Sequence, residues 1–297
     1  MKKLMILTAL MLLSFTAEAF AGVNVVATLP FIGSLAKEIG GDRIEVATLL
    51  KPTQDPHYVE ARPSMILAAR NADILMYNGL DLEIGYLPLL IESSRNPRIQ
   101  PGKPGNFDCS QYVSAIEKPT SVDRSMGDVH PLGNPHYLFS PGNVLRVAEG
   151  IAEGLSSVDP DNEAFYKANL VAFKERFRKK EAGWRGVRLK GARFIACHKI
   201  FEYLAAGFGF EIVGYVEPKP GIPPSAGYIE GLIESIKRTK PAAILCTANY
   251  GLNDARALAA KTGLKVVVLP QDVGAQAEAK DWFTFMDLAV SSLDKGR

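Results

Sequence analysis

Histidine is the residue type that points most directly to chemistry, because this 297-residue chain has four histidines and two of them lie in nearly identical tetrapeptides. His57 lies in Asp-Pro-His-Tyr and His136 lies in Asn-Pro-His-Tyr, while His198 follows an apolar run at 193–197 that is typical of a buried strand. Neutral imidazole is a common zinc ligand, and a tetrahedral site collects its ligands from separate segments. The three histidines therefore predict a transition-metal site.

Each of these histidines also has a structural alternative. His57 follows a proline-stiffened loop and would serve equally as a loop residue hydrogen-bonded to backbone, and His198 would serve as a cap of the following helix. His136 precedes Ser140 and Pro141, a good N-cap and first-turn pair, so it lies either at a binding site or at the surface. The residues alone leave both interpretations open.

A fourth ligand is expected from the second half of the chain. Asp272 directly follows the apolar run 266–269, and carboxylate oxygens complete many zinc sites. Glu217 is its rival, but the proline-rich segment 218–224 gives Glu217 a structural role of its own. The fourth histidine, His130, lies in a loop-like segment, so we rank it second to the nearby histidine and do not count it as a ligand.

The segments that carry these residues alternate between strand-like and helix-like patterns. Strand-like runs in the first half lie at 23–29, 44–50 and 74–77, and those in the second half lie at 194–197, 211–216, 243–246 and 266–269. Helical patterns separate them, and this alternation is typical of parallel sheets, which bind ligands beyond the carboxyl ends of their strands. The chain is therefore predicted to be α/β, with two Rossmann-like lobes at 22–140 and 186–297.

The longest helical pattern lies between these lobes, at 141–185, and its one real interruption is at 157–160. One long helix that crosses between the lobes would explain it, since a helix of about 30 residues covers about 45 Å. The alternative is two helices broken at Pro160.

The first 21 residues have the pattern of a cleaved signal peptide: Lys2 and Lys3, then an apolar run at 4–15, then a small-x-small site at 19–21. That run is shorter than the ~20 residues needed to span a bilayer. Cysteine is absent near the cut, so we expect an exported periplasmic chain without a lipid anchor or membrane insertion.

Charge and cysteine content narrow the function classes. The formal net charge of +2 gives no electrostatic reason to bind nucleic acid or an acidic membrane.

Cys109, Cys197 and Cys246 form an odd set, so at most one disulfide can form. The last two lie in apolar strand-like runs, where a free cysteine behaves as a small core hydrophobe.

Together these segments resemble the periplasmic solute-binding proteins of zinc/manganese ABC importers, the cluster A-I or zinc-uptake type. The resemblance covers the whole chain after the leader and rests on these matches: 55–58 with 62–64, 133–137, His198 with 201–204 and 208–210, and 217–225 for the zinc branch. It implies two α/β lobes joined by one long rigid helix, which supports the single-helix interpretation. It also implies an ABC import permease as partner.

The resemblance carries the metal ligands onto His57, His136, His198 and Asp272. Two departures stand out. Many zinc-type members have a histidine-rich loop between the first two ligands, which this chain lacks. The segment 138–141 reads Leu-Phe-Ser-Pro where relatives often read Trp-Leu-Asp-Pro, but Ser still caps a helix.

The expected function is that of a monomeric, non-catalytic carrier of one Zn2+ ion. Three imidazoles and one carboxylate suit zinc, whereas Mn2+ prefers more oxygen ligands. The alternatives are a manganese- or iron-binding member of the same family and a secreted zinc-dependent hydrolase. The hydrolase would need a general base, and the sequence lacks His-Glu-x-x-His. A binder of an organic solute would leave the repeated Pro-His-Tyr segments unexplained.

Overall fold

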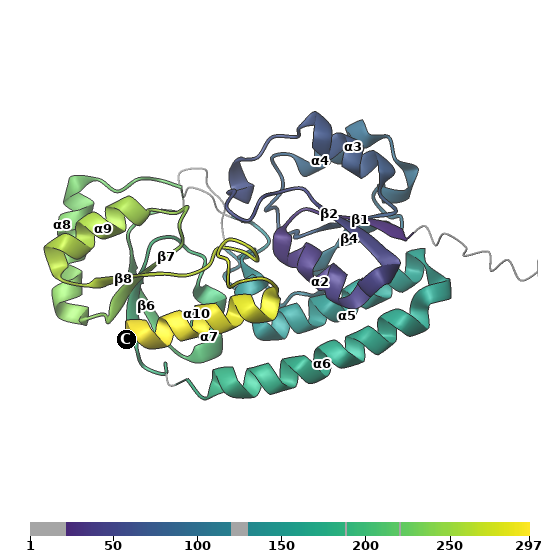
Figure 1. Cartoon of the computed structure of the whole chain (residues 1–297). Coiled ribbons are helices and arrows are strands. Elements are labelled where there is room, and N and C mark those ends of the chain that lie inside the picture. The colour runs from purple at the N-terminus through teal and green to yellow at the C-terminus, as the bar shows by residue number, and fades with distance from the viewer. Residues whose placement is uncertain (1–21, 120–129, 188, 220) are drawn as a thin grey trace, which may run out of the picture.

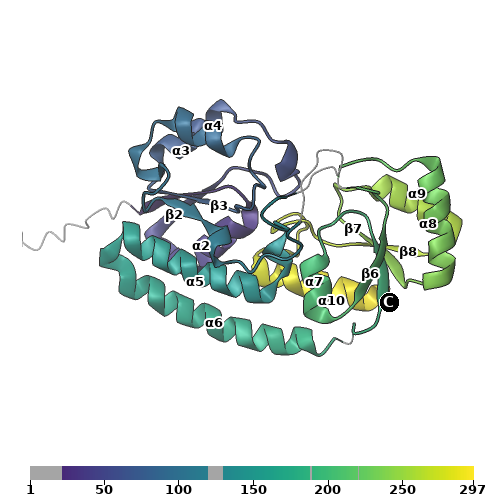
Figure 2. The same ribbon diagram turned by 180° about the vertical axis from the view of Figure 1, so that it is seen from behind.

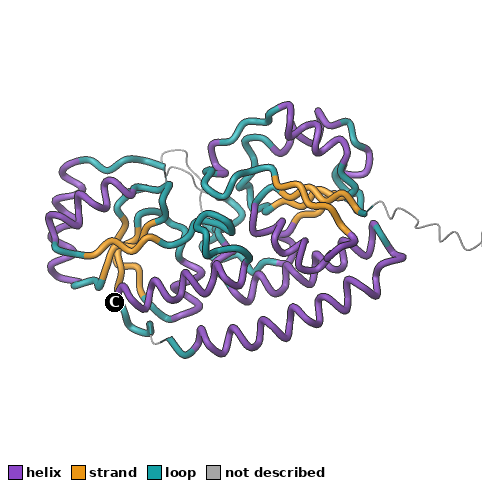
Figure 3. The backbone as a smooth tube through the Cα atoms, viewed as in Figure 1, coloured by secondary structure: helices purple, strands orange, loops and turns teal. Residues whose placement is uncertain are grey.

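The computed structural model describes residues 22–119, 130–187, 189–219 and 221–297, so the predicted signal peptide at 1–21 lies outside the described residues. Two lobes lie next to each other, each built on its own sheet, and two long helices run along one side of the molecule (Figure 1). Loops gather between the two sheets (Figure 3). This arrangement confirms the predicted two-lobe α/β fold.

The first lobe contains a four-stranded parallel sheet with the order β2-β1-β3-β4. Its strands are β1 (Val23–Ala27), β2 (Ile44–Thr48), β3 (Ile74–Tyr77) and β4 (Asn106–Asp108), and its helices are α2 (Pro30–Gly40), α3 (Pro63–Asn71) and α4 (Leu87–Ser94). Each helix has a proline in its first turn, where the missing N–H costs nothing. Figure 2 shows α3 and α4 on one face of the sheet and α2 on the other.

The second lobe repeats this topology with the order β6-β5-β7-β8, again parallel. Its strands are β5 (Arg193–Ala196), β6 (Glu211–Tyr215), β7 (Ala243–Cys246) and β8 (Lys265–Val268), and its helices are α7 (Glu202–Phe208), α8 (Ala226–Thr239), α9 (Leu252–Thr262) and α10 (Trp282–Gly296). In both lobes the second strand of the sequence lies at the edge and the first lies inside the sheet. The two halves of the chain therefore place their strand-end loops equivalently.

The expected single helix at 141–185 is wrong in its extent. The segment forms α5 (Pro141–Val158), a 3-10 turn (Pro160–Asn162) and α6 (Glu163–Arg185), which fold back on each other. Asp159 has φ −143° and ψ 72°, outside the helical region, because a residue before proline is driven away from it. The predicted long helix between the lobes is α6, which starts at the turn rather than at residue 141.

The lobes also pack directly on each other through α6 and α10. Trp282, in α10, stacks on Phe177 of α6 at 6.2 Å between ring centroids, and its indole N–H donates to the Leu138 carbonyl at 2.9 Å. Arg176 of α6 pairs with Glu38 in the first lobe at 2.8 Å and with Asp281 in the second at 2.6 Å. One hydrophobic cluster runs through both lobes, and a separate cluster lies within the second lobe.

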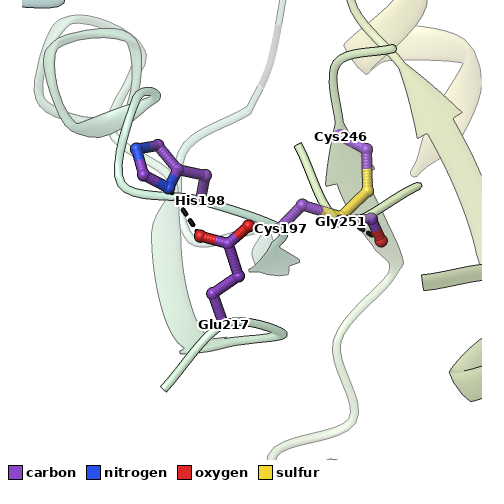
Figure 4. The surroundings of a disulfide bond; sticks show 5 residues. All are labelled: Cys197, His198, Glu217, Cys246 and Gly251. Atoms are coloured by element: carbon purple, nitrogen blue, oxygen red, sulfur yellow. Dashed lines mark hydrogen bonds and ion pairs between the residues drawn. A yellow bond between two sulfur atoms is a disulfide. The ribbon is translucent and has the colours of Figure 1, made fainter. Parts of the chain in front are cut away.

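Cys197 and Cys246 form a disulfide (Figure 4). Cys109 is free and buried. This agrees with the expectation of at most one disulfide, and it settles which two of the three cysteines pair. Ala196 and Leu245 are partners in the β5–β7 register, so the residues that follow them lie next to each other, with Cα atoms 5.0 Å apart. The disulfide joins the carboxyl ends of two neighbouring strands.

Candidate metal centre

The three predicted histidines converge between the lobes, although more than 60 residues separate each from the next. Ring centroids of His57 and His136 lie 5.4 Å apart, those of His57 and His198 lie 6.1 Å apart, and those of His136 and His198 lie 6.0 Å apart. The first two histidines belong to the first lobe and the third belongs to the second. Such a cluster requires both lobes to be in place.

His57 is oriented by the residue two positions before it. The Asp55 carboxylate accepts from the His57 backbone N–H at 3.0 Å and from its Nδ1 at 2.7 Å, on a short 3-10 turn that Pro56 begins. Burial raises the pKa of Asp55, but hydrogen bonds to His57 and its charge outweigh burial and leave the pKa below its usual value. Because a carboxylate only accepts, Nδ1 carries the proton and Nε2 keeps the lone pair that can bind a cation.

His198 has the same kind of partner in the second lobe. It lies at the carboxyl end of β5, and its Nδ1 lies 2.7 Å from an oxygen of Glu217, which follows β6 (Figure 4). Glu217 also accepts from the Gly221 backbone N–H at 3.1 Å. Its side chain is 12% exposed and that of His198 is 3% exposed. Glu217 therefore contacts the cluster through His198.

His136 is fixed by its backbone. Its N–H donates to the Asn134 side-chain oxygen at 2.9 Å, and Asn134 in turn contacts Glu202 of the second lobe at 3.4 Å. Burial, and then the charges of the neighbouring imidazoles, hold the pKa of His136 well below its usual value. The ring is therefore neutral near pH 7, the form that binds metal.

His130 joins the cluster, which the sequence analysis did not expect. Its Nε2 lies 3.1 Å from the Nε2 of His57, close to the separation of about 3.3 Å that two nitrogen ligands have around a tetrahedral zinc ion. One ligand atom each from His57, His130 and His136 lies within 4.8 Å of the others. Burial and the charges of His57 and His198 lower the pKa of His130 to about 3. Its position in a proline-containing loop gave no sequence signal for this.

Asp272 lies beside the cluster and lines the same cavity as His136. Its carboxylate accepts from the backbone N–H groups of Val273, at 2.7 Å, and of Phe31, in the first turn of α2. Burial raises its pKa to about 8 against the effect of these two hydrogen bonds. Among the described residues, the group of metal-binding side chains within 4.8 Å of one another includes neither Asp272 nor His198.

The sequence matches the family described as zinc-uptake complex component A, periplasmic, over residues 25–296. The chain belongs to this zinc-uptake family. Nearly all of the described fold lies within the match, so both lobes and all four histidines are part of it. The resemblance seen in the Pro-His-Tyr segments is thereby confirmed.

Some curated relatives are named for zinc and others for manganese. The zinc-binding lipoprotein AdcA of Streptococcus pneumoniae strain R6 is 25% identical over 277 residues, which is 91% of this chain and 55% of that protein. The chain thus spans about half the length of the relatives of this name. The manganese ABC transporter substrate-binding lipoprotein PsaA of Streptococcus anginosus is 24% identical over 280 residues, 92% of this chain and 87% of that protein.

Solved structures of other proteins share the architecture of this chain. A crystal structure of ZnuA is 24% identical and superimposes with a TM-score of 0.76, covering 92% of this chain and 98% of that chain. The manganese-bound periplasmic metal binding protein from Candidatus Liberibacter asiaticus is 21% identical, with a TM-score of 0.74 and coverage of 91% and 98%. These likenesses establish the fold. Within the described part of this chain, every helix is too short or too polar to cross a membrane.

Proposed function

We propose that this chain is a periplasmic solute-binding protein that captures one divalent transition metal between its lobes and delivers it to an ABC import permease. The observation that supports this most directly is the convergence of imidazoles from both lobes. In two of these imidazoles, those of His57 and His198, Nδ1 is hydrogen-bonded to a carboxylate. Such carboxylate partners orient ligating histidines and raise their basicity. The relatives named as ABC transporter substrate-binding proteins support the same role.

The proposed ligands are His57, His136, His198 and Asp272. The three histidines supply imidazole nitrogens from rings whose centroids lie 5.4 to 6.1 Å apart, and Asp272 supplies the carboxylate from the second lobe. His130 competes for this fourth position, because it already lies within the imidazole cluster.

Zinc is the proposed cargo. Imidazole nitrogens suit zinc, and manganese prefers sites with more oxygen atoms. The names of the relatives include both zinc and manganese, so family membership does not identify the metal. The types of ligand atom at the site have to decide it. The histidine-rich donor set of this chain favours Zn2+.

Transport rather than catalysis is the proposed role of the bound ion. A catalytic zinc keeps an open position for water beside a general base. Here the carboxylates of Asp55 and Glu217 already accept from histidine Nδ1 atoms. We propose that the chain acts as a monomer in the periplasm after removal of its leader.

The function is tested by titrating metal-free protein with zinc against a chromophoric chelator. One zinc per chain is expected, and His57→Ala, His136→Ala and His198→Ala should each weaken binding by more than about 100-fold, beyond the 10- to 100-fold loss typical of residues that only orient a ligand. Wild-type affinity in both His57→Ala and His136→Ala would place the site elsewhere.

The fourth ligand is tested by comparing Asp272→Ala with His130→Ala. Asp272→Ala should weaken binding less than the three histidine changes, because water can replace one carboxylate. A larger loss for His130→Ala than for Asp272→Ala would assign the fourth position to the imidazole. Glu217→Ala should behave as the loss of an orienting partner, about 10- to 100-fold.

A further inference from the structure

The loop 247–251, between β7 and α9, reaches from the second lobe to the loop of the first lobe that carries His57. The Asn249 side-chain amide donates to the Thr53 carbonyl. The next residue, Tyr250, donates its hydroxyl to the Asp55 carboxylate at 2.9 Å. Two consecutive side chains of one lobe thus bind the segment that positions a proposed ligand of the other.

Tyr250 contacts a histidine from each lobe. Its ring stacks on His198 with centroids 4.5 Å apart and planes 10° apart, and its hydroxyl oxygen lies 3.5 Å from His57 Nδ1. The side chain is buried, at 7% exposure. Asp55 therefore binds both the histidine it orients and a tyrosine of the opposite lobe, so that opening of the lobes must break a hydrogen bond to the group that holds His57.

The loop itself is held by the second lobe. Gly251 has φ +59°, and the Cys197 Sγ atom lies 3.8 Å from its carbonyl oxygen. A Cβ atom at position 251 would lie 3.6 Å from Glu217 Oε1. The end of this loop therefore packs against the Cys197–Cys246 disulfide and against the carboxylate that orients His198.

We propose that loop 247–251 is a latch between the lobes, and that Tyr250 is a positioning residue that sets the rate of metal release. This inference rests on the proposed function. The side chain does not bind the ion in this scheme. It stabilises the closed arrangement through Asp55, so its loss increases the dissociation rate and leaves the association rate and the ligand set unchanged. Among variants of one binding site, most changes in affinity arise from changes in the dissociation rate.

The test uses Tyr250→Phe, which keeps the ring that stacks on His198 and removes the hydroxyl. Zinc-loaded protein is mixed with excess chromophoric chelator and release is followed by stopped flow. Release should be faster by about tenfold, the contribution of one hydrogen bond to a charged group, while association should change by less than about threefold. Tyr228→Phe is the matched control, because its hydroxyl donates to the Tyr215 carbonyl at 2.8 Å within the second lobe, and its release rate should equal that of the wild type.

Two further measurements accompany the release kinetics of Tyr250→Phe. Asn249→Ala removes the other contact of the latch and should also increase the release rate, which keeps the test available if Tyr250→Phe folds poorly. The visible spectrum of the cobalt-substituted protein should be the same in Tyr250→Phe and wild type, since the ligands are unchanged.

Three outcomes would overturn the proposal. Wild-type release rates in both Tyr250→Phe and Asn249→Ala would exclude the latch while leaving the proposed metal carrier intact. A changed cobalt spectrum in Tyr250→Phe would show that this residue acts on the coordination itself. A wild-type protein that binds no zinc would reject the proposed function, and the latch with it.

Discussion

At the scale of single residues, Glu83 shows how the first lobe supports the site from behind. It is 1% exposed, and it accepts from the Thr28 hydroxyl at 2.6 Å and from the backbone N–H groups of Asn78 at 2.7 Å and Gly79 at 3.1 Å. The Asn78 amide donates to the Pro135 carbonyl at 3.1 Å, directly before His136. One buried carboxylate thus fixes the loop after β3, which in turn contacts a segment that carries a proposed ligand.

Glu83 should make the stability of the metal-free protein depend on pH. Burial raises its pKa from 4.5 to about 7, against three hydrogen bonds that lower it. The folded state therefore binds the proton more tightly, so the stabilisation is complete below pH 4.5 and is lost as pH rises through about 7, by roughly 3 kcal/mol in total. In urea unfolding, the stability of Glu83→Gln relative to wild type should increase from pH 5 to pH 8.

The control for this prediction is Glu92→Gln, because Glu92 is an exposed residue of α4. Its difference from wild type should stay constant across the same pH range. Other buried groups titrate alike in both proteins and cancel in the comparison. A constant difference for Glu83→Gln as well would show that its carboxyl group titrates normally.

Only the residues of the candidate site that stand out by their type, or by their position at the end of a strand, could be predicted from the sequence. His57, His136 and His198 follow from a repeated tripeptide and from positions at strand ends. The partner of His57 was within reach, because Asp55 precedes it by two residues. Tyr250 carries no signal, since its role depends on contacts with residues more than 190 positions away, at Asp55 and His57.

At the scale of elements, the start of α10 joins helix capping to the contact between lobes. The Asp281 carboxylate accepts from the Thr284 backbone N–H at 2.7 Å, and the Thr284 hydroxyl accepts from the Asp281 N–H at 2.9 Å, which is a capping box. Arg176 of α6 donates to the same carboxylate at 2.6 Å. Burial raises the pKa of Asp281, but hydrogen bonds from Thr284 and Arg176 outweigh it and lower the pKa overall.

Asp281→Ala is expected to reduce the free energy of unfolding by about 1–2 kcal/mol at pH 7, the usual effect of losing an N-cap. Because the folded pKa is lowered, the stabilisation is present above the unfolded pKa near 3.8 and is lost as pH falls through the folded pKa. The deficit measured by urea unfolding should therefore shrink in strong acid. Asp294→Ala, at the exposed end of the same helix, should change stability by less than about 0.5 kcal/mol.

Element types were easier to predict than element limits. Buried parallel strands such as β1 and β3 read as apolar runs because both of their faces are covered. Strand β4 has three residues and one buried side chain, too short for any periodicity to show. The break at Pro160 was one of two open alternatives, because the flanking helical patterns do not reveal whether the chain continues or turns back.

At the scale of the whole molecule, the two lobes could be predicted but their packing could not. The number of lobes follows from the sequence, because strands and helices alternate in the same way in each half of the chain. The contact between them depends on pairs such as Phe177 with Trp282 and Phe139 with Phe201, at 6.2 Å and 5.4 Å between ring centroids. The sequence of either segment does not show which distant aromatic side chain it contacts, because that pairing depends on how the whole chain folds.

This packing limits how far the lobes can move when metal binds. Helix α10 contacts both α2 and α6, and the buried Trp282 indole donates to the Leu138 carbonyl at 2.9 Å, so a wide hinge opening would expose a large aromatic interface. We expect the radius of gyration measured by small-angle scattering to change by less than about 1 Å on adding zinc, as in other preorganised binding partners.

Trp282→Ala tests whether this interface is the cause. Loss of the side chain should reduce the free energy of unfolding by about 3–5 kcal/mol and increase the change in radius of gyration on zinc binding, because the lobes lose the contact that fixes their angle. Phe194→Ala, which creates a cavity within the second lobe beside Phe210, is the control, since it should destabilise the chain and leave the shape change as in the wild type. A large shape change in the wild type would mean that the interface between α6 and α10 opens despite its burial.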